Sequence, residues 1–175
     1  SGDGTGGNVT VRAMTMNVTD GGQIGTFTGA DLALGELTGG IGPGGNITVS
    51  AQDFLTLAGF SSDLGVTSSI SSQTFGPGEA GDISSSAPIT TLENGGQLFS
   101  SSFTGEAPTG NISVIAPSSL SISGSNPFGS SQIQTTTGTL SVTAGSATIT
   151  DRGSVNGGGN IDFQVQNDFN VTAGG

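Results

Sequence analysis

The fold class that the sequence predicts is an all-β solenoid of about six coils, each built from three short strands. The first observation is a phrase that returns six times, a glycine followed by alternating apolar and polar residues, as in Gly7-Asn8-Val9-Thr10-Val11. The glycines recur at intervals of 21 to 38 residues, a period typical of stacked repeats. Helical periodicity is absent, and the 33 glycines disfavour helix generally. The later copies of the phrase begin at Gly45, Gly81, Gly110, Gly138 and Gly159.

The second repeat shows how the chain forms one coil. Period-two alternation predicts a first strand over 46–50, and the chain is expected to turn at Ala51-Gln52-Asp53. A second strand over 54–58 follows, then a loop over 59–67. A third strand over 68–75 completes the coil. Corresponding strands of successive coils then pair in parallel, about 4.8 Å apart.

Matching positions of the repeats carry apolar side chains, which predicts columns of inward-facing residues. Burying each such side chain contributes about 1.5–3 kcal/mol. Leu55, Ile70 and Ile133 are expected to face inward with them. The serine runs 84–86 and 100–102 fall on strands and are expected to point outward or to be small inward residues. The predicted columns contain Ile47, Val49, Leu57, Ile112, Val114, Leu120, Ile122, Leu140, Val142 and Ile161.

The composition excludes several kinds of chemistry. The chain has no Cys, His, Trp or Tyr, its only basic residues are Arg12 and Arg152, and its net charge is −11. A Ser-His-Asp triad cannot form, nor can the usual zinc or iron–sulfur sites. An acidic surface with two arginines does not bind nucleic acid, and no apolar run approaches the ~20 residues of a membrane helix. The sequence therefore predicts that the protein is not an enzyme and has no catalytic or cofactor-binding residues.

We expect residues 1–175 to form a single repeat segment that belongs to a longer fibre. No change of composition marks a domain boundary, and the variable repeat length is explained by loops such as 27–43. The polar start at Ser1-Gly2-Asp3 does not resemble a signal peptide.

Two motifs have both a functional and a structural interpretation. The run from Gly76 to Gly81 matches G-x-G-x-x-G, but a nucleotide site requires a helix after it, whereas here a strand is expected. Asparagine follows the glycine in four of the phrases, and several of these match the glycosylation pattern. We favour a structural role, because turn Asn residues bond local backbone and can stack as ladders. The asparagines concerned are Asn8, Asn46, Asn111 and Asn160, with further acceptor patterns at Asn17 and Asn170.

The acidic residues raise two further hypotheses. Glycoside hydrolysis would need a carboxylate pair, for which Asp53, Asp63 and Asp82 are candidates. A polysaccharide lyase would also need a base, and Arg12 and Arg152 lie near opposite ends of the chain. Calcium is possible near Asp3-Gly4-Thr5-Gly6 or Asp162, although the G-G-x-G-x-D calcium repeat is missing. The alternative is that the acidic charge keeps the protein soluble and discourages sheet association.

Threonine and phenylalanine residues suggest two binding surfaces. Threonines such as Thr15, those at 135–137 and those at 148–150 could form an ice-binding array, but their spacing is irregular. Phe75, Phe103 and Phe128 could form a sugar platform, but buried stacking between coils is the favoured interpretation.

The cadence Gly-Gly-Asn-Ile-Thr-Val, Leu-Thr-Leu-Ala-Gly and Ser-Ser-Ile-Ser-Ser-Gln-Thr-Phe-Gly-Pro-Gly resembles the repeat region of filamentous-haemagglutinin-like exoproteins. These are large proteins secreted by two-partner systems, and the resemblance is particularly to the cyanobacterial-type repeat proteins. The resemblance covers residues 6–175 and implies a right-handed parallel β-helix without catalytic residues.

The resemblance further implies the shaft of a secreted or cell-surface fibre with roles in adhesion, aggregation or biofilm. Its partners would be flanking repeats, copies of itself end to end, surface glycans or cell receptors. The alternatives are a carbohydrate-active or carbohydrate-binding β-helix and a self-assembling fibre subunit.

Overall fold

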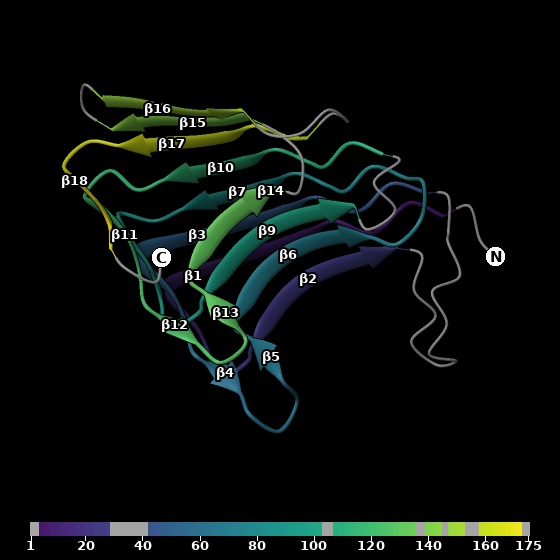
Figure 1. The fold of residues 1–175 in the computed structure, drawn as a ribbon, viewed down its shortest axis with the longest axis horizontal. Helices are drawn as coiled ribbons and strands as arrows, with labels where there is room; N and C mark the ends of the chain where they lie inside the picture. The colour runs from purple at the N-terminus through teal and green to yellow at the C-terminus, as the bar shows by residue number, and fades with distance from the viewer. Residues whose placement is uncertain are drawn as a thin grey trace.

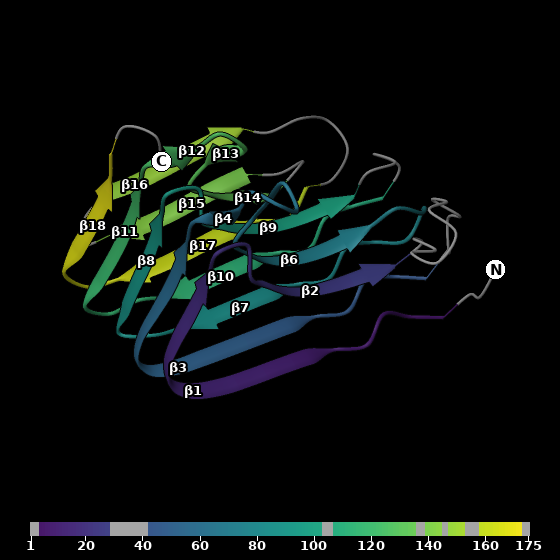
Figure 2. The same ribbon diagram turned by 90° about the horizontal axis from the view of Figure 1, so that it is seen from below.

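The computed structural model describes residues 4–28, 42–102, 107–135, 139–144, 147–152 and 158–172. Every regular element within these ranges is a β-strand, so the all-β prediction is confirmed. The strands lie on three faces around an apolar interior (Figures 1 and 2). None of the residues described forms a helix with the length and apolarity needed to cross a membrane.

The first face collects the strands that follow the repeated glycines. Neighbouring strands pair in parallel with matching positions opposite each other, for example Ile47 opposite Val9 and opposite Ile83. The strands, in stacking order, are β1 (Val9–Thr19), β3 (Ile47–Ala58), β7 (Ile83–Ser86), β10 (Ile112–Ile115) and β17 (Ile161–Val165).

The second and third faces are stacked in the same parallel way. The second face continues from the first because β1 and β3 bend and belong to both, as Figure 2 shows. Its remaining strands are β8 (Ile89–Glu93), β11 (Ser119–Ser123) and β18 (Asp168–Val171). The third face is a separate four-stranded sheet of β2 (Gln23–Thr28), β6 (Ser69–Thr74), β9 (Gln97–Ser102) and β14 (Gln132–Thr135).

The bend between the first two faces differs from the turn predicted at 51–53. That stretch remains extended inside β3, and the register against β1 shifts there, between Ala13 and Thr15. Such a bulge lets a strand bend while it stays paired. In later repeats Pro88 and Pro117 stand at the bend, and proline has no N–H for the ladder, so the strand divides in two.

The corner between the second and third faces has two forms. In the first and third repeats it is a tight turn in which Asp20 and Asn94 have positive φ, each followed by a glycine. In the second and fourth repeats an antiparallel hairpin projects instead, so the loop predicted over 59–67 contains two short strands. The hairpins are β4 (Phe60–Ser61) with β5 (Val66–Thr67), and β12 (Ser125–Asn126) with β13 (Gly129–Ser130).

The predicted inward columns are confirmed wherever the structure describes the side chains. Leu57, Val114 and Leu120 are fully buried, and Leu55 and Ile70 are buried as expected. The side chains of Leu140 and Val142 lie outside the description. The other confirmed residues are Ile47, Val49, Ile112, Ile122 and Ile161.

The stacking order predicted for the last two repeats is wrong. The Gly159 phrase, not the Gly138 phrase, lies next to the fourth repeat, because β17 pairs with β10. The Gly138 phrase forms β15 (Thr139–Ala144) on the outer side of β17, and β16 (Ala147–Arg152) pairs antiparallel with β15 at the edge (Figure 1). The two phrases alternate in the same way, so either strand satisfies the pairing that β10 offers.

This order can be tested with cysteines, because the chain has none of its own. Ser113 and Asp162 are direct partners across β10 and β17. Adjacent strands lie about 4.8 Å apart, within disulfide range, so Ser113→Cys with Asp162→Cys should oxidise to a disulfide. Ser113→Cys with Ser141→Cys should not, since β17 separates them. The opposite result, read by gel mobility and mass spectrometry, would establish stacking in chain order.

The third repeat offers a test of the packing. Ser85 is buried, its hydroxyl has no partner, and its register neighbours are Val49 and Val114. Ser85→Val removes an unsatisfied polar group and extends an apolar column, so it should stabilise the fold by about 1 kcal/mol in urea unfolding. Ser84→Val, at the half-buried neighbouring position, is the control. A loss of stability in Ser85→Val alone would mean that the column has no room for the methyl groups.

Candidate functional site

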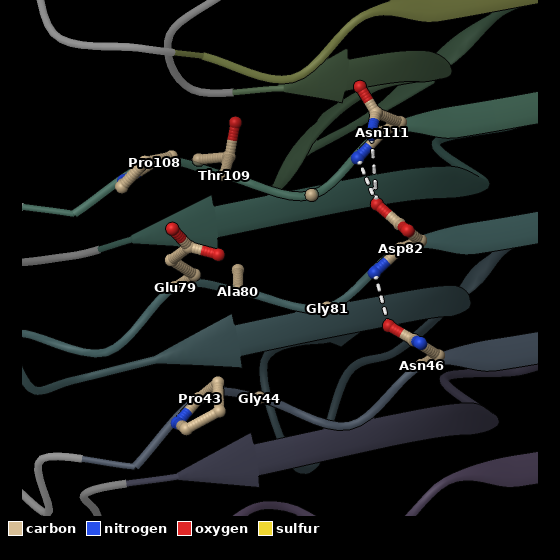
Figure 3. Close-up of a pocket in the computed structure, with 11 residues that line it drawn as sticks. Pro43, Gly44, Asn46, Glu79, Ala80, Gly81, Asp82, Pro108, Thr109 and Asn111 are labelled. Carbon is tan, nitrogen blue, oxygen red and sulfur yellow. Dashed lines mark hydrogen bonds between the residues drawn. The ribbon is translucent and has the colours of Figure 1, made fainter.

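One candidate site is a shallow groove of about 470 Å³ along the repeated glycines. Three chain segments, one from each of three successive repeats, cross it side by side before entering the first face (Figure 3). Glu79 and Asp82 are the two carboxylates in its lining. The lining residues are Pro43, Gly44, Asn46, Glu79, Ala80, Gly81, Asp82, Pro108, Thr109, Gly110 and Asn111.

A ladder of Asn and Asp side chains, here called the Asx ladder, runs along one side of the groove. The side-chain oxygen of each rung accepts the backbone N–H of the next rung, as from Asp82 N–H to Asn46 Oδ1 at 2.8 Å. Asp82 Oδ1 accepts both the backbone N–H and the side-chain Nδ2 of Asn111, at 2.7 and 3.1 Å. The ladder therefore joins five repeats through the rungs Asn8, Asn46, Asp82, Asn111 and Asn160.

Backbone packs directly on backbone at the glycine that precedes each rung. A Cβ added to Gly81 would overlap the carbonyl oxygen of Gly45, and one added to Gly110 would overlap that of Gly81. The same holds for Gly45 against Gly7 and for Gly159 against Gly110. These glycines are therefore required by close approach rather than by an unusual backbone angle.

Buried hydroxyls on the third face bond to these glycines from inside. Ser72 Oγ donates to the Gly45 carbonyl and accepts the N–H of Gly81, at 3.1 and 2.8 Å. Ser100 repeats the pattern one level on, between the Gly81 carbonyl and the Gly110 N–H. Thr26 Oγ1 donates to the Gly45 carbonyl at 2.8 Å. This hydroxyl column satisfies backbone groups that would otherwise be buried without a partner.

The carboxylates proposed for hydrolysis have different surroundings. Asp82 is a rung of the ladder, Asp53 lies exposed at the bend of β3, and Asp63 lies between β4 and β5. Within the described ranges, no three His, Cys, Asp or Glu side chains are grouped closely enough to hold a metal ion. Asp162 lies on β17, where Gln164 Nε2 donates to its carboxylate at 3.4 Å, and Asp3 lies outside the description.

The other candidate motifs are found mainly in structural positions. The run from Gly76 to Gly81 connects β6 to β7, so a strand follows it, as the sequence indicates. Arg12 lies on β1 and Arg152 ends β16, while the acceptor residues Asn17 and Asn170 are exposed on β1 and β18.

The threonines and phenylalanines that the structure describes lie in different surroundings. Thr15 is exposed on β1, whereas Thr135 Oγ1 donates to the Gly159 carbonyl at 3.0 Å. Thr136, Thr137 and the side chains at 148–150 lie outside the description, as does Phe103. Phe75 is half-buried. The prediction of burial is wrong for Phe128, which is 48% exposed because it lies on the projecting hairpin, 5.3 Å from the ring of Phe60.

Sequence reasoning missed two features of this site. Asp82 is a candidate for hydrolysis by residue type, but it occupies the same place in its phrase as Asn46 and Asn111 in theirs. The hydroxyl column was missed because a strand position alone does not show which backbone group a hydroxyl reaches. A Ser or Thr two residues after each inward Ile or Leu of the third strands was the available signal.

Comparisons with family models, curated proteins and solved structures found no match for this chain.

The ladder can be tested at a single rung. Asn46→Ala leaves the Asp82 amide without its acceptor and should lower stability by about 1 kcal/mol, a fall of about 2–4 °C in Tm for a chain of this size. Asn46→Asp keeps an oxygen in place and should lose less. Asn17→Ala, at an exposed strand position of β1, is the matched control. Equal losses of Tm for Asn46→Ala and Asn17→Ala in calorimetry would show that the Asn46 side chain stabilises the fold no more than an exposed strand residue does.

Proposed function

We propose that the chain is a segment of a right-handed parallel β-helix that forms the shaft of a secreted or cell-surface fibrous protein. Its role is structural and adhesive, in adhesion, aggregation or biofilm, and it is not an enzyme. This agrees with the resemblance of its repeats to filamentous-haemagglutinin-like exoproteins of two-partner secretion systems.

The observation that carries the proposal is the repetition of the same contacts along five successive levels. The five levels from Asn8 to Asn160 are each joined to the next by a close glycine contact and an Asx hydrogen bond to the backbone. An enzyme places different side chains at one level to build a reacting centre, whereas a shaft repeats one joint. Here the residues that line the groove mainly form the glycine contacts and Asx hydrogen bonds between levels.

The charge distribution supports an exposed shaft. The net charge of −11 and the absence of Lys and His give copies of the chain a mutual repulsion that opposes lateral sheet association. The outward positions near the groove are small and polar, such as Thr48, Ser84 and Ser113. Such a surface suits a protein that works in water at high local density.

Carbohydrate binding or cleavage remains the alternative, since Glu79 and Asp82 line one groove. Against cleavage, both Asp82 side-chain contacts go to Asn111, so its oxygen is held by the ladder. A self-assembling fibre subunit is a third possibility.

The adhesive role can be tested by displaying the chain on the surface of non-aggregating bacterial cells. Display should increase cell aggregation and retention on surfaces under flow. The control is Gly81→Val displayed at an equal level, because its side chain overlaps the Gly45 carbonyl and disrupts the stack. No gain over cells without the chain, or an equal gain from Gly81→Val, would contradict the proposal.

Purified chain should release neither reducing ends nor unsaturated products from neutral and acidic polysaccharides. Products that Asp82→Asn abolishes would favour the carbohydrate-active alternative instead.

A further inference from the structure

The first repeat contains a glycine that the residues around it do not explain. Gly45, Gly81, Gly110 and Gly159 each face the carbonyl oxygen of the preceding repeated glycine, which leaves no room for a Cβ. A Cβ on Gly7 would meet nothing within 4 Å, and Gly7 has no positive φ that would favour glycine. At Gly45, Gly81, Gly110 and Gly159 the position of a Cβ is occupied by the carbonyl oxygen of the preceding glycine. At Gly7 the same position is open to solvent or to another chain segment.

The Asx ladder has a direction, and within the described part of the chain the backbone N–H of its first rung has no acceptor of the kind that the later rungs have. The backbone N–H of each later rung bonds to an Asn or Asp oxygen of the level before it, at 2.7–2.9 Å. Asn8 offers its own oxygen to Asn46 in this way, but no described residue supplies an oxygen to the Asn8 N–H. The donor is thus placed where a preceding Asx oxygen would bind.

The apolar residues of the first repeat are covered on one side only. Val9, Val11, Ala13 and Ile24 are only partly buried. Their register partners Ile47, Val49, Ala51 and Ile70 are buried to 7% exposure or less. β1 pairs with β3 and β2 with β6, so the opposite edges of β1 and β2 are unpaired among the described strands. These edges continue the interface that joins all the inner levels.

From these three observations we propose that this end of the stack, formed by Gly7, Asn8, β1 and β2, is a docking surface for one further coil that carries the Gly-Asx phrase. The coil binds in parallel register, with its glycine carbonyl over Gly7 and its Asn or Asp oxygen at the Asn8 N–H. The inference rests on the proposed stacked shaft and names the partner of its first described level.

The far end of the chain does not supply such a coil. There the outermost described strand of the first face is β16, which runs antiparallel to β15. Among the described strands the third face ends at β14, at the level of the fourth repeat, while the first face continues through β17 and β15 to β16. A second copy stacked head to tail would therefore meet an antiparallel edge instead of a Gly-Asx level, and the docking coil must have a different source.

The test adds a coil whose structure is already known from the chain itself. In the extended chain, residues 43–80 replace residues 1–6, so that the added Ala80 is followed by Gly7 as the native Ala80 is followed by Gly81. Gly7→Ala is then made in the native and in the extended chain. Thr10→Ala, an exposed position on β1, is the control in both.

Gly7→Ala should leave the native Tm unchanged, because the methyl group enters open space. In the extended chain it should lower Tm by roughly 5 °C, because the methyl group then overlaps a carbonyl. Thr10→Ala should have the same effect in both. Equal effects of Gly7→Ala in the two chains, or proteolysis of the added coil while the rest stays intact, would overturn the proposal.

Sedimentation of the native chain provides a second arm. Association that rises with concentration and is removed by Gly7→Val would assign the surface to a second copy, against the proposal. Neither arm depends on adhesion, so a failed docking test and a failed display experiment remain distinguishable.

Discussion

The close contact of one glycine with the backbone of the glycine before it is the constraint on which the rest of this structure depends. It brings successive levels near enough for the Asx oxygens to reach the next backbone amide. It also places the glycine carbonyls and amides within reach of Ser72 and Ser100 on the third face. A single added methyl group at this point would separate two levels and break three kinds of contact together.

The interior combines apolar columns with buried hydroxyls, and the two have different tasks. Columns such as that of Ile47, Ile83 and Ile112 remove apolar surface from water and supply most of the driving force. The third-face hydroxyls instead satisfy the turns, where the backbone leaves the sheets and loses its ladder partners. Not every inward hydroxyl succeeds, since Ser85 and Thr90 are buried without a partner in the third repeat.

The sequence predicts those features that recur at a fixed phase. Ile47, Val49 and Leu57 could be placed inward because period-two alternation and the repeat agree about them. The continuity of β3 could not be predicted, because an extended bend and a turn both accept polar residues such as Gln52 and Asp53. The role of Asp82 could be read only by treating Asp as equivalent to Asn. The order of the last strands is not predictable from pattern, since it depends on which of two similar strands packs better against β10.

That last feature gives the C-terminal region two competing topologies of similar pattern. In spacing, Leu140, Val142, Ala147 and Ile149 match Ile83, Ser85, Thr90 and Leu92 of the third repeat, so the same segment also fits as a coil in chain order. During synthesis β15 is available to β10 before β17 emerges, whereas the finished arrangement has β17 in that place. If β15 pairs with β10 first, β17 must displace it to reach the finished arrangement, which adds a step to folding at this end.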